Sequence, residues 1–422
     1  MRMLGPVATV ALCVVAFALS LRAGLAYGLE NAISLGAGAV SLVAMSQCLV
    51  LAARPRFLEP AFGGLDRMYH VHKWLGIAAL GAMVLHEQIE LDFERWIRET
   101  RLGDFGKDVG EVAYYGLIAL VLFSWIKRIP LINWEVPYHV WWFTHRLTGA
   151  FFALVVLHQL LVDMPFGWAD PLPVLLNVLG VTGIACYIFI EFVAARWRRR
   201  GYRVATLARE AGATRVSPRP TGRAMRWRPG QFAFLSAPAP GLREPHPFTI
   251  GRDPDVDNGI RFLVKPLGDW TRRLPDRLRP GDAVAVEGPY GRFDFRKGSG
   301  QQIWIAGGVG ITPFLAWVQS LAKDENRRIH LFYSVRTAEE AIGLDILKDA
   351  TALFPCFSFD LVVTTQDGRL DARRVARGAP FDPNGADFFF CGPVNLRNAI
   401  LKGLKSLGIT PRRVRFELFE FR

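Results

Sequence analysis

The sequence has few cysteines, and they show no paired spacing. Only five occur among 422 residues, at Cys13, Cys48, Cys186, Cys356 and Cys391. Because three of them fall in apolar segments, the pattern indicates neither a disulfide framework nor a zinc site. Acidic residues are also fewer than basic ones, 38 against 51, which leaves a net charge of +13.

The chain lacks a nucleic-acid-binding motif despite this basic charge. Its basic residues flank apolar segments and lie in the C-terminal half, which favours a membrane surface as their partner. A calcium-binding loop or another cytosolic activating segment is also missing, so we expect constitutive activity. We therefore expect contact with membrane lipid, no nucleic acid and no obligatory protein partner.

Long apolar runs are abundant, and hydrophobic residues make up 51% of the chain. Six segments are near the ~20 residues that a helix needs to cross a bilayer. They are residues 1–26, 33–53, 70–89, 112–126, 144–162 and 172–193. The first could also be a cleaved signal peptide, but its apolar run is long for one and its cleavage site is weak. We therefore expect six transmembrane helices.

The charges between these segments predict their orientation. Basic residues gather after the second, fourth and sixth segments, and they favour the cytoplasmic side. The loop after His86 is instead rich in acidic residues. They are Glu87, Glu90, Asp92, Glu94, Glu99, Asp104, Asp108 and Glu111. We therefore expect this loop outside a multi-pass cell-membrane protein, and the C-terminal half in the cytoplasm.

Two of the segments each carry a pair of histidines. HKWLGIAALGAMVLH holds His72 and His86, and HRLTGAFFALVVLH holds His145 and His158, with spacings of 86 − 72 = 14 and 158 − 145 = 13 residues. Each pair is about 20 Å apart along a helix, so one helix cannot hold both sides of one metal. Two adjacent helices can hold two metals, with His72 facing His145 and His86 facing His158. Such a bis-imidazole site on each level suits a low-spin haem that passes electrons.

The two spacings differ in helical phase. At ~100° per residue, 14 residues return to within about 40° of the same face, whereas 13 residues miss it by about 140°. The second helix must therefore bend, change pitch or approach its metals from different sides. His70 and His139 lie just before their helices, where interfacial polar residues are common, although His70 could compete with His72 as a ligand.

The composition changes after Arg200. Residues 202–300 contain short β-type runs broken by Pro and Gly, which predicts a small antiparallel barrel. From residue 301 strands and helices alternate, which predicts a doubly wound α/β nucleotide-binding domain. We therefore expect three domains, at residues 1–196, 197–300 and 301–422.

Short motifs follow one another in this half. They read HPFTI at 246–250, GDWT at 268–271, GPYG, AGGVGITP at 306–313, and FFFCGP. The glycines of AGGVGITP let the backbone approach a pyrophosphate at the start of a helix, where free N–H groups favour anions. Each motif alone is equally typical of a turn, and their order is what is specific.

In this order the motifs resemble the ferredoxin–NADP reductase superfamily. Together with the paired histidines, the chain resembles bacterial members of the NADPH oxidase and ferric reductase family of transmembrane flavocytochromes. The resemblance covers essentially the whole chain and implies FAD, two b-type haems and NADPH, with NADH possible. The FAD residues it implies are His246, Pro247, Phe248, Thr249, Lys265, Gly268, Asp269, Trp270 and Thr271. The nicotinamide nucleotide residues it implies are Gly307, Gly308, Gly310, Thr312, Pro313, Cys391, Gly392 and Pro393, of which Thr312 and Cys391 are assigned to catalysis.

The resemblance also implies three further roles. A C-terminal aromatic, Phe419 or Phe421, would cover the flavin ring until nicotinamide displaces it, unless FELFEFR is a plain edge strand. Phe151 lies between the two histidine levels and matches a bridging aromatic, although ordinary helix packing explains it nearly as well. Arg22, near the outer end of the first helix, could attract an anion or stabilise superoxide.

The second strand of the nucleotide domain, RIHLFYSV, ends at Ser334-Val335-Arg336. The adenosine ribose lies near this position in a doubly wound domain. A hydroxyl and a guanidinium suit the 2′-phosphate of NADPH, so we expect Ser334 and Arg336 to favour NADPH. Alternatively, Arg336 is a solvated charge that Glu339 and Glu340 neutralise.

The resemblance implies a transmembrane NAD(P)H oxidase that passes electrons through FAD and the haems to oxygen, giving superoxide. A ferric or other metal reductase is the second expectation, since an outer acidic loop would concentrate cations. The third is electron delivery to a periplasmic partner. A transporter or sensor would not need the flavin and nicotinamide motifs.

Overall fold

The computed structural model describes residues 4–417 except 90, 92, 94, 127, 130–133, 254 and 257–258. Its chain divides into two compact units, Met1–Trp197 and Arg198–Arg422. The division falls where the composition of the sequence changes. Each unit is described by itself.

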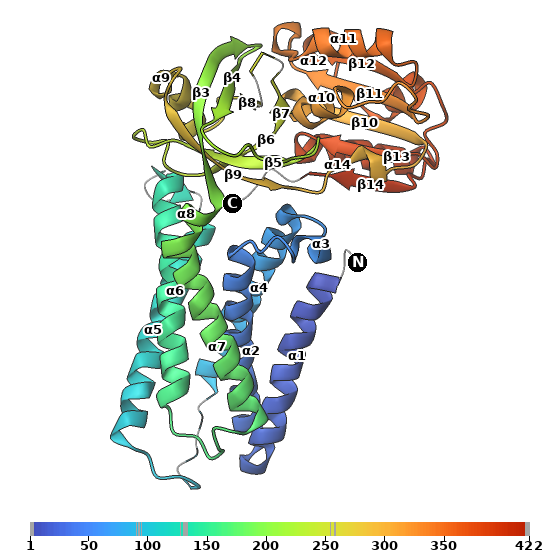
Figure 1. The fold of residues 1–422 in the computed structure, drawn as a ribbon. Helices are drawn as coiled ribbons and strands as arrows, with labels where there is room; N and C mark the ends of the chain where they lie inside the picture. Colours follow the sequence, from blue (N-terminus) through green and yellow to red (C-terminus); the bar gives the residue numbers. More distant parts are fainter. Residues whose placement is uncertain are drawn as a thin grey trace. The chain divides into compact units, whose positions relative to one another are not determined.

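The first unit is a helical bundle (Figure 1). Its long helices in the described residues are α1 (Leu4–Gly24), α2 (Leu29–Ala52), α4 (Leu65–Gln88), α5 (Arg101–Trp125), α6 (Tyr138–Leu161) and α7 (Pro171–Ile188). Five of these helices are long and apolar enough to cross a membrane, and α4 is the exception. α4 has 24 residues, as α2 does, but it carries charges and histidines that lower its hydropathy. The expected helical membrane bundle is therefore confirmed.

Shorter elements join these helices. They are η1 (Leu25–Tyr27), α3 (Glu59–Phe62), and the two strands β1 (Arg128–Ile129) and β2 (Trp134–Glu135). The helix of α7 continues through a π-helical turn, η2 (Phe189–Val193), into α8 (Ala194–Arg198). A π turn inside an α-helix is rare and often marks a functional position.

Several helix starts differ from the sequence prediction, and three of them change where acidic residues or histidines lie. α5 begins at Arg101 rather than at residue 112, because the Thr100 side chain accepts a hydrogen bond from the Gly103 amide and caps the helix. Three of the acidic residues expected in a loop, Asp104, Asp108 and Glu111, therefore lie on a helix. α4 and α6 also begin earlier than expected, so His70 and His139 lie within helices rather than before them.

The second unit begins with an antiparallel sheet. Its strands are β3 (Arg199–Glu210), β4 (Ala213–Pro220), β5 (Phe232–Ser236), β6 (His246–Thr249), β7 (Gly251–Arg252), β8 (Ile260–Val264) and β9 (Ala283–Tyr290), with α9 (Asp269–Arg277) between the last two. The seven strands are ordered β6-β5-β9-β3-β4-β8-β7. Alternate side chains of these strands, together with Trp270 and Leu274 of α9, form one apolar core. The predicted antiparallel domain is confirmed.

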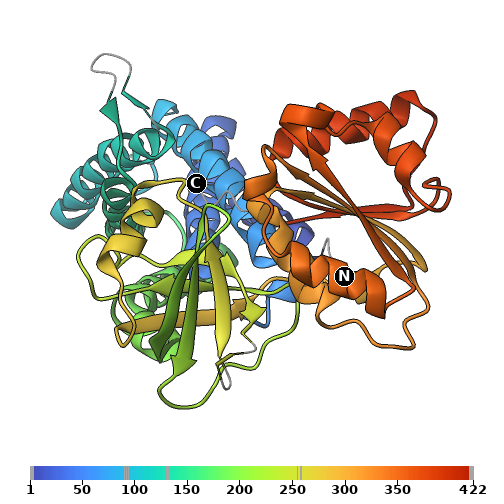
Figure 2. The ribbon, with the colours of Figure 1, turned by 90° about the horizontal axis from the view of Figure 1, so that it is seen from above.

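A parallel five-stranded sheet follows, ordered β12-β11-β10-β13-β14. Its strands are β10 (Gln301–Gly307), β11 (Arg328–Val335), β12 (Phe357–Val363), β13 (Asp387–Cys391) and β14 (Arg413–Phe416). The helical segments around it are η3 (Phe295–Lys297), η4 (Gly308–Ile311), α10 (Thr312–Val318), η5 (Ala338–Glu340), α11 (Leu344–Leu353), α12 (Thr364–Asp367), α13 (Ala372–Gly378) and α14 (Val394–Ser406). Figure 2 shows helices on both faces of this sheet, as predicted for a doubly wound domain.

Candidate functional site

The four histidines of α4 and α6 meet in two pairs. The ring centroids of His72 and His145 are 6.0 Å apart, and those of His86 and His158 are 6.4 Å apart. In both pairs the ring planes are inclined by 70°. α6 is α-helical throughout, so the 13-residue spacing does not depend on a change of helix type.

His72 and His145 are called the inner pair, after the orientation that the loop charges predict, and His86 and His158 the outer pair. The Nδ1 atoms of the inner pair contact neighbouring helices. Nδ1 of His72 lies 3.0 Å from the Cys48 carbonyl oxygen. Nδ1 of His145 lies 3.0 Å from the hydroxyl oxygen of Ser124. Since that hydroxyl donates to the Leu120 carbonyl at 2.8 Å, its oxygen accepts the proton of His145 Nδ1. Nε2 is then the ring nitrogen of His145 left for a metal.

The outer pair, named for His86 and His158, is held in a similar way. Nδ1 of His86 lies 2.9 Å from the Ser34 carbonyl oxygen, and Nδ1 of His158 lies 2.9 Å from that of Gly106. Glycine at position 110 leaves room for this ring, because a Cβ there would lie 2.4 Å from Nδ1 of His158. Carbonyl acceptors of this kind fix the tautomer and raise the basicity of a metal-binding imidazole.

These distances fit a metal between the rings of each pair. A metal–nitrogen bond of about 2 Å puts the centre of an imidazole ring about 3 Å from the metal, so two opposed rings are about 6 Å apart. Both observed distances agree with this value. Each level supplies two imidazoles, which is the protein's share of ligands in bis-histidine haem.

A cavity of about 870 Å³ adjoins the outer pair. It is lined by both outer histidines and by apolar residues of α2, α6 and α7. Its carboxylates are Glu87, Glu99, Asp108, Glu111 and Asp163. The inner histidines do not line this cavity, so the two histidine pairs differ in their access to it.

Other sequence candidates in this unit are placed as follows. The Phe151 ring packs on Gly116 of α5, where a Cβ would lie 1.9 Å from the ring. Arg22 is exposed on the last turn of α1 and does not line the outer cavity. His70 Nε2 accepts a hydrogen bond of 3.2 Å from the Trp74 indole, and this contact directs His70 to its own helix face.

The HPFT strand and the GDWT segment meet in the second unit. The rings of His246 and Phe248 lie 4.7 and 5.6 Å from the Trp270 ring. The buried hydroxyl of Thr249 has no hydrogen-bond partner in the described part of the chain. A buried hydroxyl without a partner is costly unless a ligand satisfies it, so the site fits a bound flavin.

The Thr271 side chain caps the start of α9, the helix to which it belongs. The Thr271 hydroxyl accepts hydrogen bonds of 2.9 Å from the amides of Leu267 and Gly268. Asp269 lies 3.8 Å from Arg273 one turn later. Pro247 lies within β6 and pairs with Phe234 of β5.

The two glycine-containing loops of the parallel sheet are pressed together at the carboxyl ends of β10 and β13. A Cβ on Gly310 would lie 2.3 Å from the Cys391 carbonyl oxygen, and one on Gly307 would lie 2.7 Å from Pro393. Gly392 has a φ of +149° and a neighbour at 2.9 Å, so only glycine fits there. Gly308, Thr312 and Pro313 carry the chain from β10 into α10.

Cys391 is fully enclosed at this position. Burial raises the pKa of its thiol well above the usual value, with a further contribution from Glu417. The thiol is therefore protonated at neutral pH. Lys265 lies nearby, since its Nζ is 4.0 Å from a Cβ at Gly308, and it forms an ion pair of 2.8 Å with Glu340.

Ser334 and Arg336 stand at the end of β11, as expected. Ser334 is buried opposite Gly307 in the neighbouring strand, and Arg336 is exposed. Glu340 is engaged by Lys265. Phe419 and Phe421 lie outside the described residues.

Sequence reasoning missed the groups that hold the histidines. The carbonyls of Cys48, Ser34 and Gly106 leave no signature in a sequence. Ser124 had a signal, because it is a lone hydroxyl in the apolar run LIALVLFSW. A polar residue in such a run usually faces a partner inside the bundle.

Comparison with known proteins agrees with this arrangement. Residues 37–156 match the ferric reductase-like transmembrane component, residues 214–294 an FAD-binding domain, and residues 304–402 an oxidoreductase NAD-binding domain. Ferric reduction oxidase 8, mitochondrial, of Arabidopsis thaliana is 26% identical over 338 residues, which cover 71% of this chain and 42% of that protein. The reductase component of propane 2-monooxygenase from Rhodococcus jostii (strain RHA1) is 27% identical over 239 residues, covering 53% of this chain and 63% of that protein.

The chain spans about half the length of the curated relatives it matches. The crystal structure of flavohemoglobin from Malassezia yamatoensis has a similar fold, with a TM-score of 0.51 at 17% identity, over 95% of this chain and 99% of that one. The chain thus joins a segment similar to the ferric reductase-like transmembrane component to segments similar to FAD-binding and NAD-binding oxidoreductase domains, in the order that the sequence motifs predicted.

Proposed function

We propose that this transmembrane oxidoreductase passes electrons from NADPH through FAD and two b-type haems to oxygen, and that it releases superoxide. The observation that carries the proposal is the two-level arrangement of histidine pairs. Both pairs have the separation that one metal requires, and each Nδ1 has an acceptor. Imidazoles in apolar helices are costly and usually functional.

Flavin, when bound, takes a two-electron hydride and releases single electrons, and bis-imidazole haem carries single electrons. The chain would hold the inner haem with His72 and His145 and the outer haem with His86 and His158. Phe151 would lie between the two levels. Since His86 and His158 would both hold the outer haem, an acceptor would take its electron without binding the iron, and the cavity beside the outer pair supports its access.

The orientation is part of the proposal. Arg196, Arg198, Arg199 and Arg200 follow α7, and basic residues at the end of a span favour the cytoplasmic side. The flavin and nucleotide domains would then be cytoplasmic. The cavity with its carboxylates would face outward.

Ferric ion is the second candidate acceptor. Carboxylates in the wall of the outer cavity attract cations, and oxygen ligands suit them. One relative is also named a ferric reduction oxidase. Oxygen is uncharged and needs no charged site. The acidic lining of the cavity therefore supports only the ferric-ion alternative.

The experiment is a turnover assay on the purified protein in detergent. Haem and FAD are quantified, and two haems and one FAD per chain are expected. NADPH oxidation is then followed with oxygen or a ferric chelate as the acceptor. Cytochrome c reduction that superoxide dismutase abolishes supports superoxide release, whereas turnover only with the chelate supports ferric reduction. Absence of haem would overturn both.

NADPH preference is proposed from Ser334 and Arg336. A charge-assisted hydrogen bond is worth roughly 1.5–3 kcal/mol, so kcat/KM should favour NADPH by about ten- to a hundredfold. Arg336→Ala should weaken NADPH use and leave NADH nearly unchanged. Equal losses for both nucleotides would assign Arg336 to a group that they share.

A further inference from the structure

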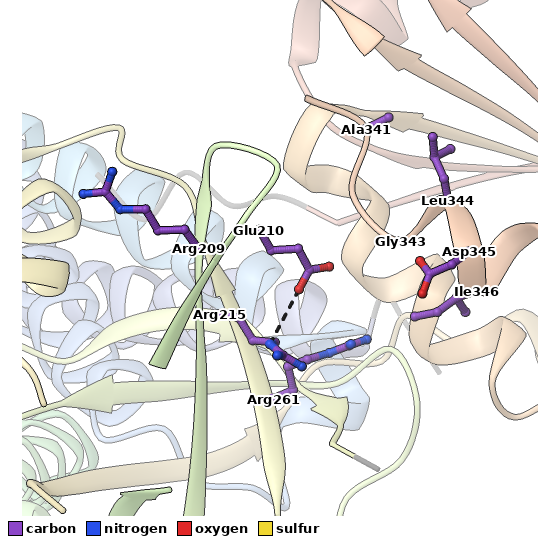
Figure 3. Close-up of a pocket in the computed structure, with 9 residues that line it drawn as sticks. All are labelled: Arg209, Glu210, Arg215, Arg261, Ala341, Gly343, Leu344, Asp345 and Ile346. Carbon is purple, nitrogen blue, oxygen red and sulfur yellow. Dashed lines mark ion pairs between the residues drawn. The ribbon is translucent and has the colours of Figure 1, made fainter. Parts of the chain in front are cut away.

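A second cavity, of about 430 Å³, lies within the second unit, between the antiparallel sheet and the start of α11. Figure 3 shows arginine side chains on one side of it and residues 343–346 on the other. None of the flavin or nucleotide residues named above lines it. Its volume is in the range of small-molecule sites.

Arg261 is the main observation. This residue of β8 is only 7% exposed and lines the cavity. Within the part of the chain that the structure describes, its side chain forms no ion pair or hydrogen bond. An arginine this enclosed, with no carboxylate partner in that part of the chain and facing a cavity, favours an anion in that cavity.

Arg215 of β4 lies beside Arg261, and its guanidinium has carboxylates nearby but at long distances. Its Nε is buried without a hydrogen bond among the described residues. The nearest carboxylate oxygens belong to Glu210, 3.7 Å from Nε, and Asp255, 4.0 Å from Nη1. These distances are too long for hydrogen bonds. In Figure 3 Arg215 and Arg261 extend toward α11, whereas Arg209 points away.

The opposite wall is the N-terminus of α11, a helix of ten residues. Its cap is Gly343, with a φ of +68° and no space for a Cβ, which would lie 2.7 Å from Leu315. Glycine is therefore required, and it has no side chain with which to cap the helix. The first amides of α11 are left to an anion, which the helix end also attracts.

We infer that this cavity binds a phosphate group, held by Arg261 and Arg215 on one side and by the first amides of α11 on the other. The planar guanidinium fork matches phosphate oxygens. Asp345, exposed on the first turn of α11, opposes the anion and limits its affinity. The bound group would tie the flavin domain to the nucleotide domain. The phosphate belongs either to a separate phosphorylated metabolite or to the 2′-position of NADPH. In the second case the inference rests on the proposed function, and this cavity would hold the 2′-phosphate in place of Ser334 and Arg336.

The test measures thermal unfolding of the full-length holoprotein in detergent, followed by FAD fluorescence. Inorganic phosphate is titrated against chloride at constant ionic strength. We expect phosphate to raise the melting temperature of the wild type, and Arg261→Gln to weaken phosphate binding about ten- to a hundredfold. Arg219→Gln, an exposed arginine of β4 outside the cavity, is the matched control and should behave as the wild type.

Asp345→Asn separates the inference from its rival, in which Arg261 simply pairs with Asp345. The inference expects tighter phosphate binding, whereas the rival expects a lower melting temperature and no phosphate response. Identical phosphate responses of the wild type and Arg261→Gln would also overturn the inference. Competition by 2′-AMP but not 5′-AMP would identify the NADPH phosphate as the source. A phosphate effect that persists with saturating NADP⁺ would identify a separate ligand.

Discussion

The two histidine levels present the same ligand atoms in different surroundings. The outer pair faces a cavity with five carboxylates, while the inner pair does not line it. Nδ1 of both outer histidines donates to a backbone carbonyl, while Nδ1 of inner His145 donates to the Ser124 hydroxyl oxygen. Electron transfer between cofactors needs only proximity, whereas delivery to an external acceptor needs access. If both levels hold haem as proposed, exchange with the acceptor would therefore take place at the outer level.

The largest effect on haem content and turnover is expected when both histidines of the outer pair are replaced. His86→Ala/His158→Ala should leave one haem per chain and abolish reduction of the external acceptor, because it deletes both outer ligands. FAD reduction by NADPH should persist. Haem is measured by pyridine haemochrome, and turnover by acceptor reduction.

His70→Ala is the control for this variant, since His70 bonds to Trp74 rather than to a facing histidine. It should retain both haems. Full haem content in the double variant would contradict the assignment of the outer pair.

A smaller and more selective effect is expected from Gly110→Ala. The added Cβ would lie 2.4 Å from Nδ1 of His158, so the ring must move away from the Gly106 carbonyl. Loss of such a supporting contact typically costs 10–100-fold in metal affinity or activity. Selective loss of the outer haem signal by redox titration is the measurement.

Gly81→Ala on α4 is the matched control, because Gly81 is exposed, lies on the helix face opposite His72, and has nothing within 4 Å of a Cβ. It should be neutral or slightly stabilising, since alanine favours a helix by about 1 kcal/mol over glycine. Equal behaviour of the two variants would show that crowding at His158 is unimportant.

The sequence was sufficient for the fold class and for the pairing of the histidines. Hydropathy marks membrane helices strongly, and the 14- and 13-residue spacings place the histidines at matching depths. The start of α5 was predicted wrongly because Asp104 and Asp108 suggested a loop, whereas Thr100 caps a helix there. Three of the four Nδ1 acceptors are backbone carbonyls, whose positions depend on how the helices pack and leave no local pattern in the sequence. Only the Ser124 hydroxyl had a signal.

The smallest expected effect is a shift in haem midpoint potential when the serine hydroxyl beside a histidine of either pair is removed. Ser124→Ala removes the acceptor of His145 Nδ1, whereas Ser34→Ala leaves His86 bonded to the Ser34 carbonyl at 2.9 Å. Loss of the acceptor makes His145 a less basic ligand, which favours the reduced iron. A hydrogen bond of about 0.5–1.5 kcal/mol corresponds to roughly 20–60 mV for one electron. Ser124→Ala should therefore raise the midpoint potential of the inner haem by this amount, and Ser34→Ala should leave the outer one nearly unchanged. Equal shifts in both variants in a spectroelectrochemical titration would show that the side chains, and not the carbonyls, control the two levels.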